Sequence, residues 1–210
     1  MLLFLSDGQY ELFALLIISI VLSLSCHEFG HAYVAKLQGD RTAEAAGRLT
    51  LNPLAHVDVF GLLMVIMVGF GYAKPVPTDP RNFTSRYSTL WVAAAGPFMN
   101  LVLAFISANV LYYLLSTGNL ADGPRLFLAI LAQINLLLML FNLLPIGPLD
   151  GHYILPYFLP KRVAYQYQVY NLKYGTMVLL GLIALSLLGV PIFSYLLGFA
   201  SVLLSYIVFV

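Results

Sequence analysis

Two histidines and a glutamate stand close together in the run His27-Glu28-Phe29-Gly30-His31. On an α-helix, residues i and i+4 project from the same face, so both imidazoles could bind one metal ion from one side. Glu28, next to the first histidine, could then accept a proton from a water molecule at that metal. This combination of residue types and spacing predicts a zinc site for hydrolysis, with Glu28 as the general base.

A catalytic zinc ion usually has three protein ligands and one open position, so a third ligand is expected elsewhere in the chain. The candidates are the other histidines and the acidic residues, namely His56, His152, Glu11, Glu44, Asp7, Asp40, Asp58, Asp79, Asp122 and Asp150. Asp150 differs from the others because it follows a Pro- and Gly-rich break inside an apolar stretch, where an unpaired carboxylate is costly. A simple turn formed by Asp150 and Gly151 is the competing interpretation.

The composition places these residues in a membrane protein. Of 210 residues, 61% are hydrophobic and only 9% are charged, whereas soluble domains carry about 25% charged residues. The chain is therefore predicted to be an integral membrane protein in contact with the lipid bilayer. Its net charge of +1 gives no reason to expect a nucleic-acid partner.

The hydropathy pattern predicts an all-α polytopic fold with about five full transmembrane helices. The expected spans cover residues 12–37, 88–115 and 125–144, followed by two short spans within 174–210. Residues 57–72 are apolar but short and rich in glycine, which predicts a re-entrant or short hairpin segment. Residues 42–52 are expected to form a loop or a small β-hairpin. Residues 156–173, with four tyrosines and three basic residues, are expected to form an interfacial segment.

The basic residues predict the orientation, because loops rich in Lys and Arg stay on the cytoplasmic side. Such residues flank the segment 57–72 on both sides, which requires this segment to enter the membrane and return. The following two spans then bring Asp150 to the same side as His31. The charge pattern therefore predicts one site, which faces the cytoplasm.

The order of the motifs resembles a known family. The run HEFGH within an apolar helix and NLLPIGPLDG at residues 142–151, with GYAKPVP at 71–77 and AGPFMN at 95–100 between them, are similar to the site-2 protease family of intramembrane zinc metalloproteases. The resemblance implies that His27, His31 and Asp150 bind one Zn²⁺ per chain and that Glu28 is the catalytic acid and base. It also implies a membrane-protein substrate, cleaved in or near a transmembrane helix in regulated intramembrane proteolysis.

The same resemblance points to a compact prokaryotic member, with residues 1–210 as a single integral-membrane metalloprotease domain. No PDZ or nucleotide-sensing domain is expected, and the cell membrane is the expected location. Asn142 is implied as a second catalytic or substrate-binding residue, and Asn100 and Lys74 are further candidates for binding substrate. His56 is expected in a solvated or interfacial turn, and His152 beside the site as a polar neighbour.

Other classes of protein make different demands on the sequence. A membrane metal-binding or transport protein is the main alternative, but it would need polar groups spread along a path through several spans. Here the histidines and acids gather towards one side. An inactive relative of the protease would be expected to lack Glu28, which is present. A metalloprotease with glutamate as its third ligand would have to use Glu44, just past the same helix.

Overall fold

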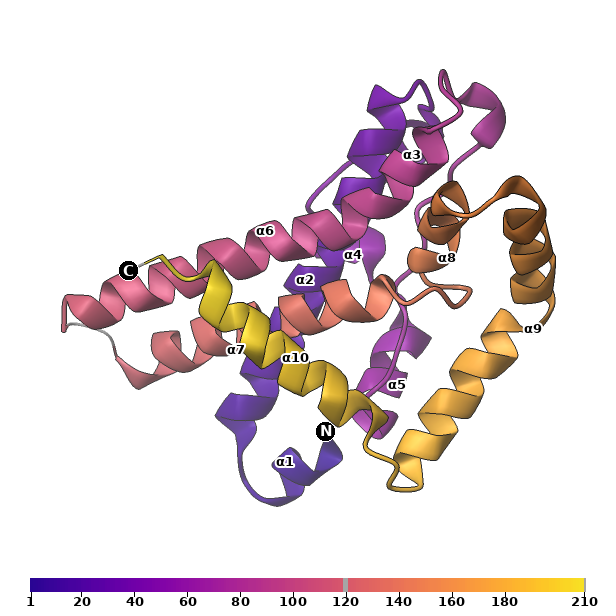
Figure 1. Cartoon of the computed structure of the whole chain (residues 1–210). Coiled ribbons are helices and arrows are strands. Elements are labelled where there is room, and N and C mark those ends of the chain that lie inside the picture. The colour runs from indigo at the N-terminus through magenta and orange to yellow at the C-terminus, as the bar shows by residue number, and fades with distance from the viewer. Residues whose placement is uncertain (119–120, 210) are drawn as a thin grey trace.

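The computed structural model describes residues 1–118 and 121–209, which form helices and connecting segments with no β-strand (Figure 1). Residues 119–120 and residue 210 lie outside the described residues. Residue 210 is the last residue of the region 174–210 in which two short spans were expected. The helices are α1 (Leu2–Ser6), α2 (Tyr10–Leu37), α3 (Thr42–Ala45), α4 (Pro53–His56), α5 (Val59–Val68), η1 (Pro80–Asn82), α6 (Ser88–Ser116), α7 (Asp122–Asn142), α8 (Gly151–Ile154), η2 (Leu155–Phe158), α9 (Lys161–Leu187) and α10 (Ile192–Ile207).

Four of the described helices, α2, α6, α7 and α9, are long and apolar enough to cross a membrane. The shortest has 21 residues, which corresponds to about 30 Å at the helical rise. The helix α10 has 16 residues, or about 24 Å, and is therefore a shorter apolar helix rather than a clear fifth span. The all-α membrane architecture is confirmed, whereas the structure does not establish five full spans.

The interfacial segment expected at 156–173 is not separate from the next apolar stretch. Residues 161–187 form one continuous helix, α9. Between its first residue and Pro191 the chain has no proline, and tyrosine, lysine and arginine are all compatible with helix. A change from interfacial to apolar composition therefore does not end the helix.

The β-hairpin considered at 42–52 is also absent from the described structure. Residues 42–45 form the single helical turn α3, and Pro53 begins another, α4. The side chain of Asn52 caps α4 by accepting a hydrogen bond from the backbone N–H of Leu54 at 3.1 Å. Polar residues that bond to nearby backbone groups favour such turns over a strand.

The centre of the molecule is formed by α2, α6 and α7, with α10 lying across α7 (Figure 1). The helices α2 and α6 approach closely because Gly30 faces the backbone of Ala95, where a Cβ atom would lie 2.7 Å from the carbonyl oxygen. Small residues at helix crossings are typical of membrane proteins, where packing rather than water exclusion holds helices together. This crossing places the HEFGH run of α2 directly against α6.

The segment between α4 and η1 leaves this core and comes back to it. The backbone N–H of Lys74 donates to the carbonyl of His56 at 2.9 Å, so the two ends of the stretch 57–73 meet. Inside the stretch, α5 ends at Gly69 with φ = 84°, and the returning chain passes Gly61 so closely that a Cβ atom there would overlap Tyr72. Ten residues of helix span about 15 Å, half of a bilayer core.

Asp40 anchors the returning chain to the end of α2. Its buried carboxylate accepts hydrogen bonds from the backbone of Thr42 at 3.0 Å and of Asp79 at 2.7 Å, and from the Asn82 side chain at 3.0 Å. Burial opposes the charged form, but the bonds from Thr42, Asn82 and Asp79 outweigh it and lower the pKa of Asp40 to about 2. The ionised carboxylate therefore holds η1 in place.

We expect Asp40→Asn to loosen residues 79–82 at neutral pH. Because the folded-state pKa is depressed, the carboxylate stabilises this contact fully above about pH 4 and loses that effect as the pH falls towards 2. At pH 7 the variant should lack roughly 1–2 kcal/mol of local stability, seen as faster hydrogen exchange of the Asp79 amide. Glu44→Gln, which changes a partly exposed carboxylate on the same connection that does not contact residues 79–82, is the control. Equal protection of Asp79 in Asp40→Asn and wild type would contradict the role of Asp40.

Candidate metal centre

The helix α2 brings its two histidines together as the i, i+4 spacing predicts. The Nε2 atoms of His27 and His31 lie 3.0 Å apart, and the two rings meet edge to face at 81°. The ring of His27 is buried, and the side chain of His31 is 12% exposed. Both nitrogens therefore point to one small space at the edge of the core.

Hydrogen bonds on the other ring nitrogens determine which atoms are free to bind a metal. The Nδ1 of His31 lies 2.7 Å from the carbonyl oxygen of Val92, which can only accept, so this Nδ1 carries the proton and donates. The Nδ1 of His27 lies 2.6 Å from the Oδ1 of Asn100. The amide nitrogen of Asn100 donates elsewhere, so Oδ1 is the acceptor here too. In neutral rings, both Nε2 atoms therefore present lone pairs to each other.

Asp150 completes the cluster from the break after α7. Its Oδ2 lies 3.2 Å from the Nε2 of His27, and its Oδ1 lies 3.4 Å from the Nε2 of His31. The Oδ2 atom is buried without a hydrogen-bond partner. Gly151 allows this placement, because a side chain there would overlap the carbonyl of Leu143 at the end of α7.

These three ligands fit a zinc ion. A tetrahedral metal with ligands at 2.0–2.1 Å separates each pair of ligand atoms by about 3.3 Å, close to the three distances found here. Two lone pairs and a carboxylate facing one another repel unless a proton or a cation lies between them. The imidazoles are oriented by an amide and a backbone carbonyl, as zinc-binding histidines usually are. The donor set of His27, His31 and Asp150 is thus suited to one divalent cation.

A glycine on α6 keeps the space beside these ligands open. A Cβ atom on Gly96 would lie 2.6 Å from the Nε2 of His27 and closer still to that of His31. Only a residue without a side chain can occupy this position if the nitrogens are to remain accessible. The space is therefore shaped by α6 as well as by the ligands themselves.

Glu28 is the predicted general base, and the structure places it in the same buried region. Glu28 as a whole is 9% exposed, and its Oε2 accepts a hydrogen bond from the backbone N–H of Val76 at 3.1 Å. Val76 belongs to the extended chain that returns from α5. The motif GYAKPVP at residues 71–77 therefore contacts Glu28, which is next to the candidate metal ligand His27.

The other three candidate residues have different surroundings. Asn100 is fully buried, and both ends of its amide are engaged, which makes it a support for His27. The side chain of Asn142 donates to the carbonyl of Leu138 in its own helix at 3.0 Å. Lys74 is exposed at the base of the returning segment. None of these contacts joins Asn142 or Lys74 to His27, His31 or Asp150, the three candidate metal ligands.

Support for His27 extends across the core through a chain of polar side chains. Asn100 donates to Asn135 at 2.8 Å, Asn135 donates to the hydroxyl of Ser23 at 2.8 Å, and Ser23 donates to the carbonyl of Ser19 at 2.6 Å. Ser23 and Asn135 had not been singled out in the sequence. The signal was their polarity inside apolar helices, where such groups need partners.

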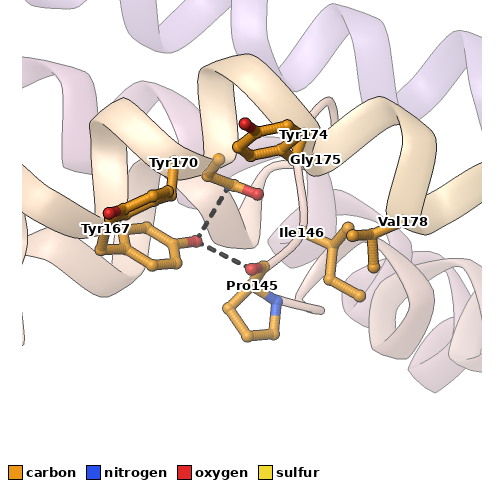
Figure 2. A pocket seen from close by; sticks show the side chains of 8 residues that line it. Pro145, Ile146, Tyr167, Tyr170, Tyr174, Gly175 and Val178 are labelled. Atoms are coloured by element: carbon orange, nitrogen blue, oxygen red, sulfur yellow. Dashed lines mark hydrogen bonds between the residues drawn. The ribbon is translucent and has the colours of Figure 1, made fainter.

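A second support fixes the loop that carries Asp150. Tyr167 of α9 donates to the carbonyl of Pro145 at 2.8 Å. This bond lies beside a pocket of about 270 Å³ between α9 and the loop, whose lining side chains are drawn in Figure 2. The neighbouring Asn171 accepts from the backbone N–H of Gly147 at 3.1 Å and bonds to the ring of His152. His152 is thus a buried neighbour of the loop, and its ring is bonded to α9 through Asn171.

Four apolar helices and a buried His/His/Asp site beside a glutamate define a membrane zinc metalloprotease. The chain matches Peptidase family M50 over residues 15–120 and 117–185, and it belongs to this family. It is 43% identical over 154 residues to "Putative zinc metalloprotease YwhC" of Bacillus subtilis (strain 168), covering 70% of each chain.

More distant relatives carry similar names. "Putative zinc metalloprotease Rip2" of Mycolicibacterium smegmatis is 35% identical over 146 residues, which are 67% of this chain and 55% of that protein. "Zinc metalloprotease MJ0392" of Methanocaldococcus jannaschii is 29% identical over 154 residues, or 73% of this chain and 36% of that protein. No solved structure matches the chain.

We expect Gly96→Ala to weaken zinc binding by roughly tenfold or more, because the added methyl group would fill the space in front of the ring nitrogens. Competition with a chromogenic chelator in detergent measures the affinity. Gly198→Ala in α10 adds the same methyl group where nothing lies within 4 Å, so it should leave the affinity unchanged. Wild-type affinity in Gly96→Ala would show that the metal binds elsewhere.

Proposed function

We propose that this protein is an intramembrane zinc endopeptidase that cleaves a membrane-protein substrate in or near a transmembrane helix. The observation that carries the proposal is the position of the metal site on α2, a helix of 28 residues that is apolar enough to span a bilayer. A soluble substrate would have little access to such a site. Regulated intramembrane proteolysis is the process that this arrangement suits.

The site residues suffice for peptide hydrolysis. A zinc ion held by His27, His31 and Asp150 would supply Lewis acidity, which makes water more acidic and polarises a carbonyl group. Glu28 takes the proton from the attacking water and then gives it to the leaving amine, as a single buried carboxyl group can do. Asn100 and Val92 keep both imidazoles in the tautomer that leaves Nε2 free.

The substrate has to be extended at the cleaved bond, because helical peptide bonds are shielded by the surrounding turns. The chain returning from α5 is extended and reaches Glu28 through Val76, so it could pair with such a substrate along its edge. We assign residues 73–80, together with the stretch 57–72, to the lining of the substrate entry. Lys74 and Asn142 are candidates for contacting substrate outside the metal site.

The proposed orientation in the membrane rests on the basic residues of the loops and on the path of residues 57–72. We propose that 57–72 is a re-entrant segment, since its two ends meet at His56 and Lys74 and α5 is too short to span. The basic residues on both sides of it then face the cytoplasm, together with the active site. We further propose that residues 1–210 act as one domain in the cell membrane of a prokaryote.

Glu28→Gln should retain zinc and lose cleavage. Glutamine keeps the size of the side chain but cannot accept and return a proton, and the loss of such a group costs about 10²- to 10⁴-fold in rate. The measurement combines metal analysis with cleavage of a model transmembrane substrate in proteoliposomes. Glu11→Gln makes the same change at an exposed position on the same helix and should cleave like wild type.

Either of two results would reject the proposed function. Cleavage that persists in Glu28→Gln would remove the assigned general base. A wild-type protein that binds zinc, cleaves no membrane substrate and moves zinc across the vesicle membrane would be a transport protein instead.

A further inference from the structure

A buried arginine lies next to the returning segment. Arg48 is 6% exposed, and it takes part in none of the salt bridges among the described residues. Its Nη2 donates to the carbonyl oxygen of Lys74 and its Nη1 to that of Pro75 at 3.3 Å. A guanidinium stays charged in proteins, so its burial without a carboxylate needs another explanation.

His56 contacts the guanidinium of Arg48 and helps to orient it. The sequence suggested a solvated or interfacial turn, and His56 does end the single helical turn α4, but it is fully buried rather than solvated. Its Nε2 lies 2.7 Å from the carbonyl of Thr50 and therefore donates, which leaves Nδ1 to accept from Arg48 at 3.4 Å. Its own carbonyl accepts from the N–H of Lys74. Arg48 and His56 together thus fix both peptide groups on either side of Pro75.

The carbonyl of Pro75 and the N–H of Val76 belong to the same peptide group. This group is planar and trans, so its oxygen and its hydrogen point in opposite directions. Arg48 binds the oxygen, and Glu28 binds the hydrogen through Oε2 at 3.1 Å. One peptide group is therefore held between a cation and an anion, with its dipole aligned to both charges.

We propose that Arg48 is a positioning residue for catalysis, which acts on Glu28 through the peptide group of Pro75 and Val76. The inference rests on the proposed function of Glu28 and adds a residue outside the metal site. Arg48 fixes the orientation of the peptide N–H, and this N–H fixes the carboxylate that has to face the water. The two buried charges also compensate each other across a single peptide group.

The local sequence restricts the backbone of the segment that joins Arg48 to Glu28. The ring of Pro75 locks its φ angle, and a residue before proline, such as Lys74, is restricted to extended conformations. Fewer backbone rotations are therefore left on the N-terminal side of this peptide group to absorb a movement of the guanidinium. Lysine could not replace arginine fully, because its single ammonium group lacks the planar fork that reaches two carbonyl groups at once.

The experiment measures kcat, KM and zinc content for the full chain in proteoliposomes, with a model transmembrane peptide as substrate. We expect Arg48→Met to lower kcat by roughly 10- to 100-fold while KM and zinc content change less than about twofold. Arg48→Lys should recover part of kcat. Arg41→Met, which removes an exposed basic side chain from the same connection, should behave like wild type.

A second variant tests whether Arg48 acts on Glu28 through the peptide group of Pro75 and Val76. It leaves the side chains of Arg48 and His56 unchanged. Val76→Pro removes the N–H that Glu28 accepts and should lower kcat to a similar extent. Since both changes act through one peptide group, the double variant should be no slower than the slower single variant. This non-additivity would not arise from two independent losses of stability.

Several outcomes would overturn the inference while leaving the proposed function intact. They are an unchanged kcat in Arg48→Met, a loss of zinc in that variant, a rise in KM alone, or multiplicative losses in the double variant. The proposed function itself fails if Glu28→Gln still cleaves, or if the wild-type protein moves zinc across the membrane and cleaves no membrane substrate, so the two failures are distinguishable.

Discussion

The two Nε2 atoms of His27 and His31 lie 3.0 Å apart, with the carboxylate of Asp150 beside them. The surrounding structure has to hold these three groups in place. Three acceptors can stay so close only around a cation or a shared proton. The tautomers must also be fixed from outside, because a ring with its proton on Nε2 cannot bind the metal. The amide of Asn100 and the carbonyl of Val92 meet that requirement from α6, so the crossing of α2 and α6 is part of the site.

That crossing depends on small and polar residues in helices that are otherwise apolar. Gly30 and Gly96 allow the two backbones to approach, the second directly in front of the ligands. The buried chain from Asn100 through Asn135 to Ser23 leaves its amide groups partnered across three helices. Polar groups in a membrane interior are costly without partners, so this chain both fixes the packing and orients His27. Stability and ligand geometry are thus produced by the same contacts.

The sequence predicted the parts of the site that follow from local geometry or from charge. The spacing of His27 and His31 implies one helical face, and the loop charges correctly brought Asp150 to their side of the molecule. Three of the four long helices, α2, α6 and α7, likewise follow from apolar stretches of sufficient length, whereas α9 was expected as an interfacial segment followed by a short span. The supports could not be predicted, because the partner of His27 is 73 positions away and depends on how α2 and α6 cross. A solvated or interfacial turn was expected at His56, and solvation was wrong because its burial involves contacts with Arg48 and Thr50, which no local pattern reveals.

The segment between Arg48 and Glu28 joins the residue proposed as general base to the proposed path of the substrate. In a low-dielectric region, two isolated charges would each be expensive to bury, and a direct ion pair would use up the carboxylate that must handle a proton. Placing one peptide group between them compensates both charges and leaves an oxygen of Glu28 free for that proton. The same peptide group lies in the extended chain proposed to receive substrate. A substrate that shifts this chain would therefore also shift the carboxylate, so the proposed entry segment and the proposed general base cannot move independently.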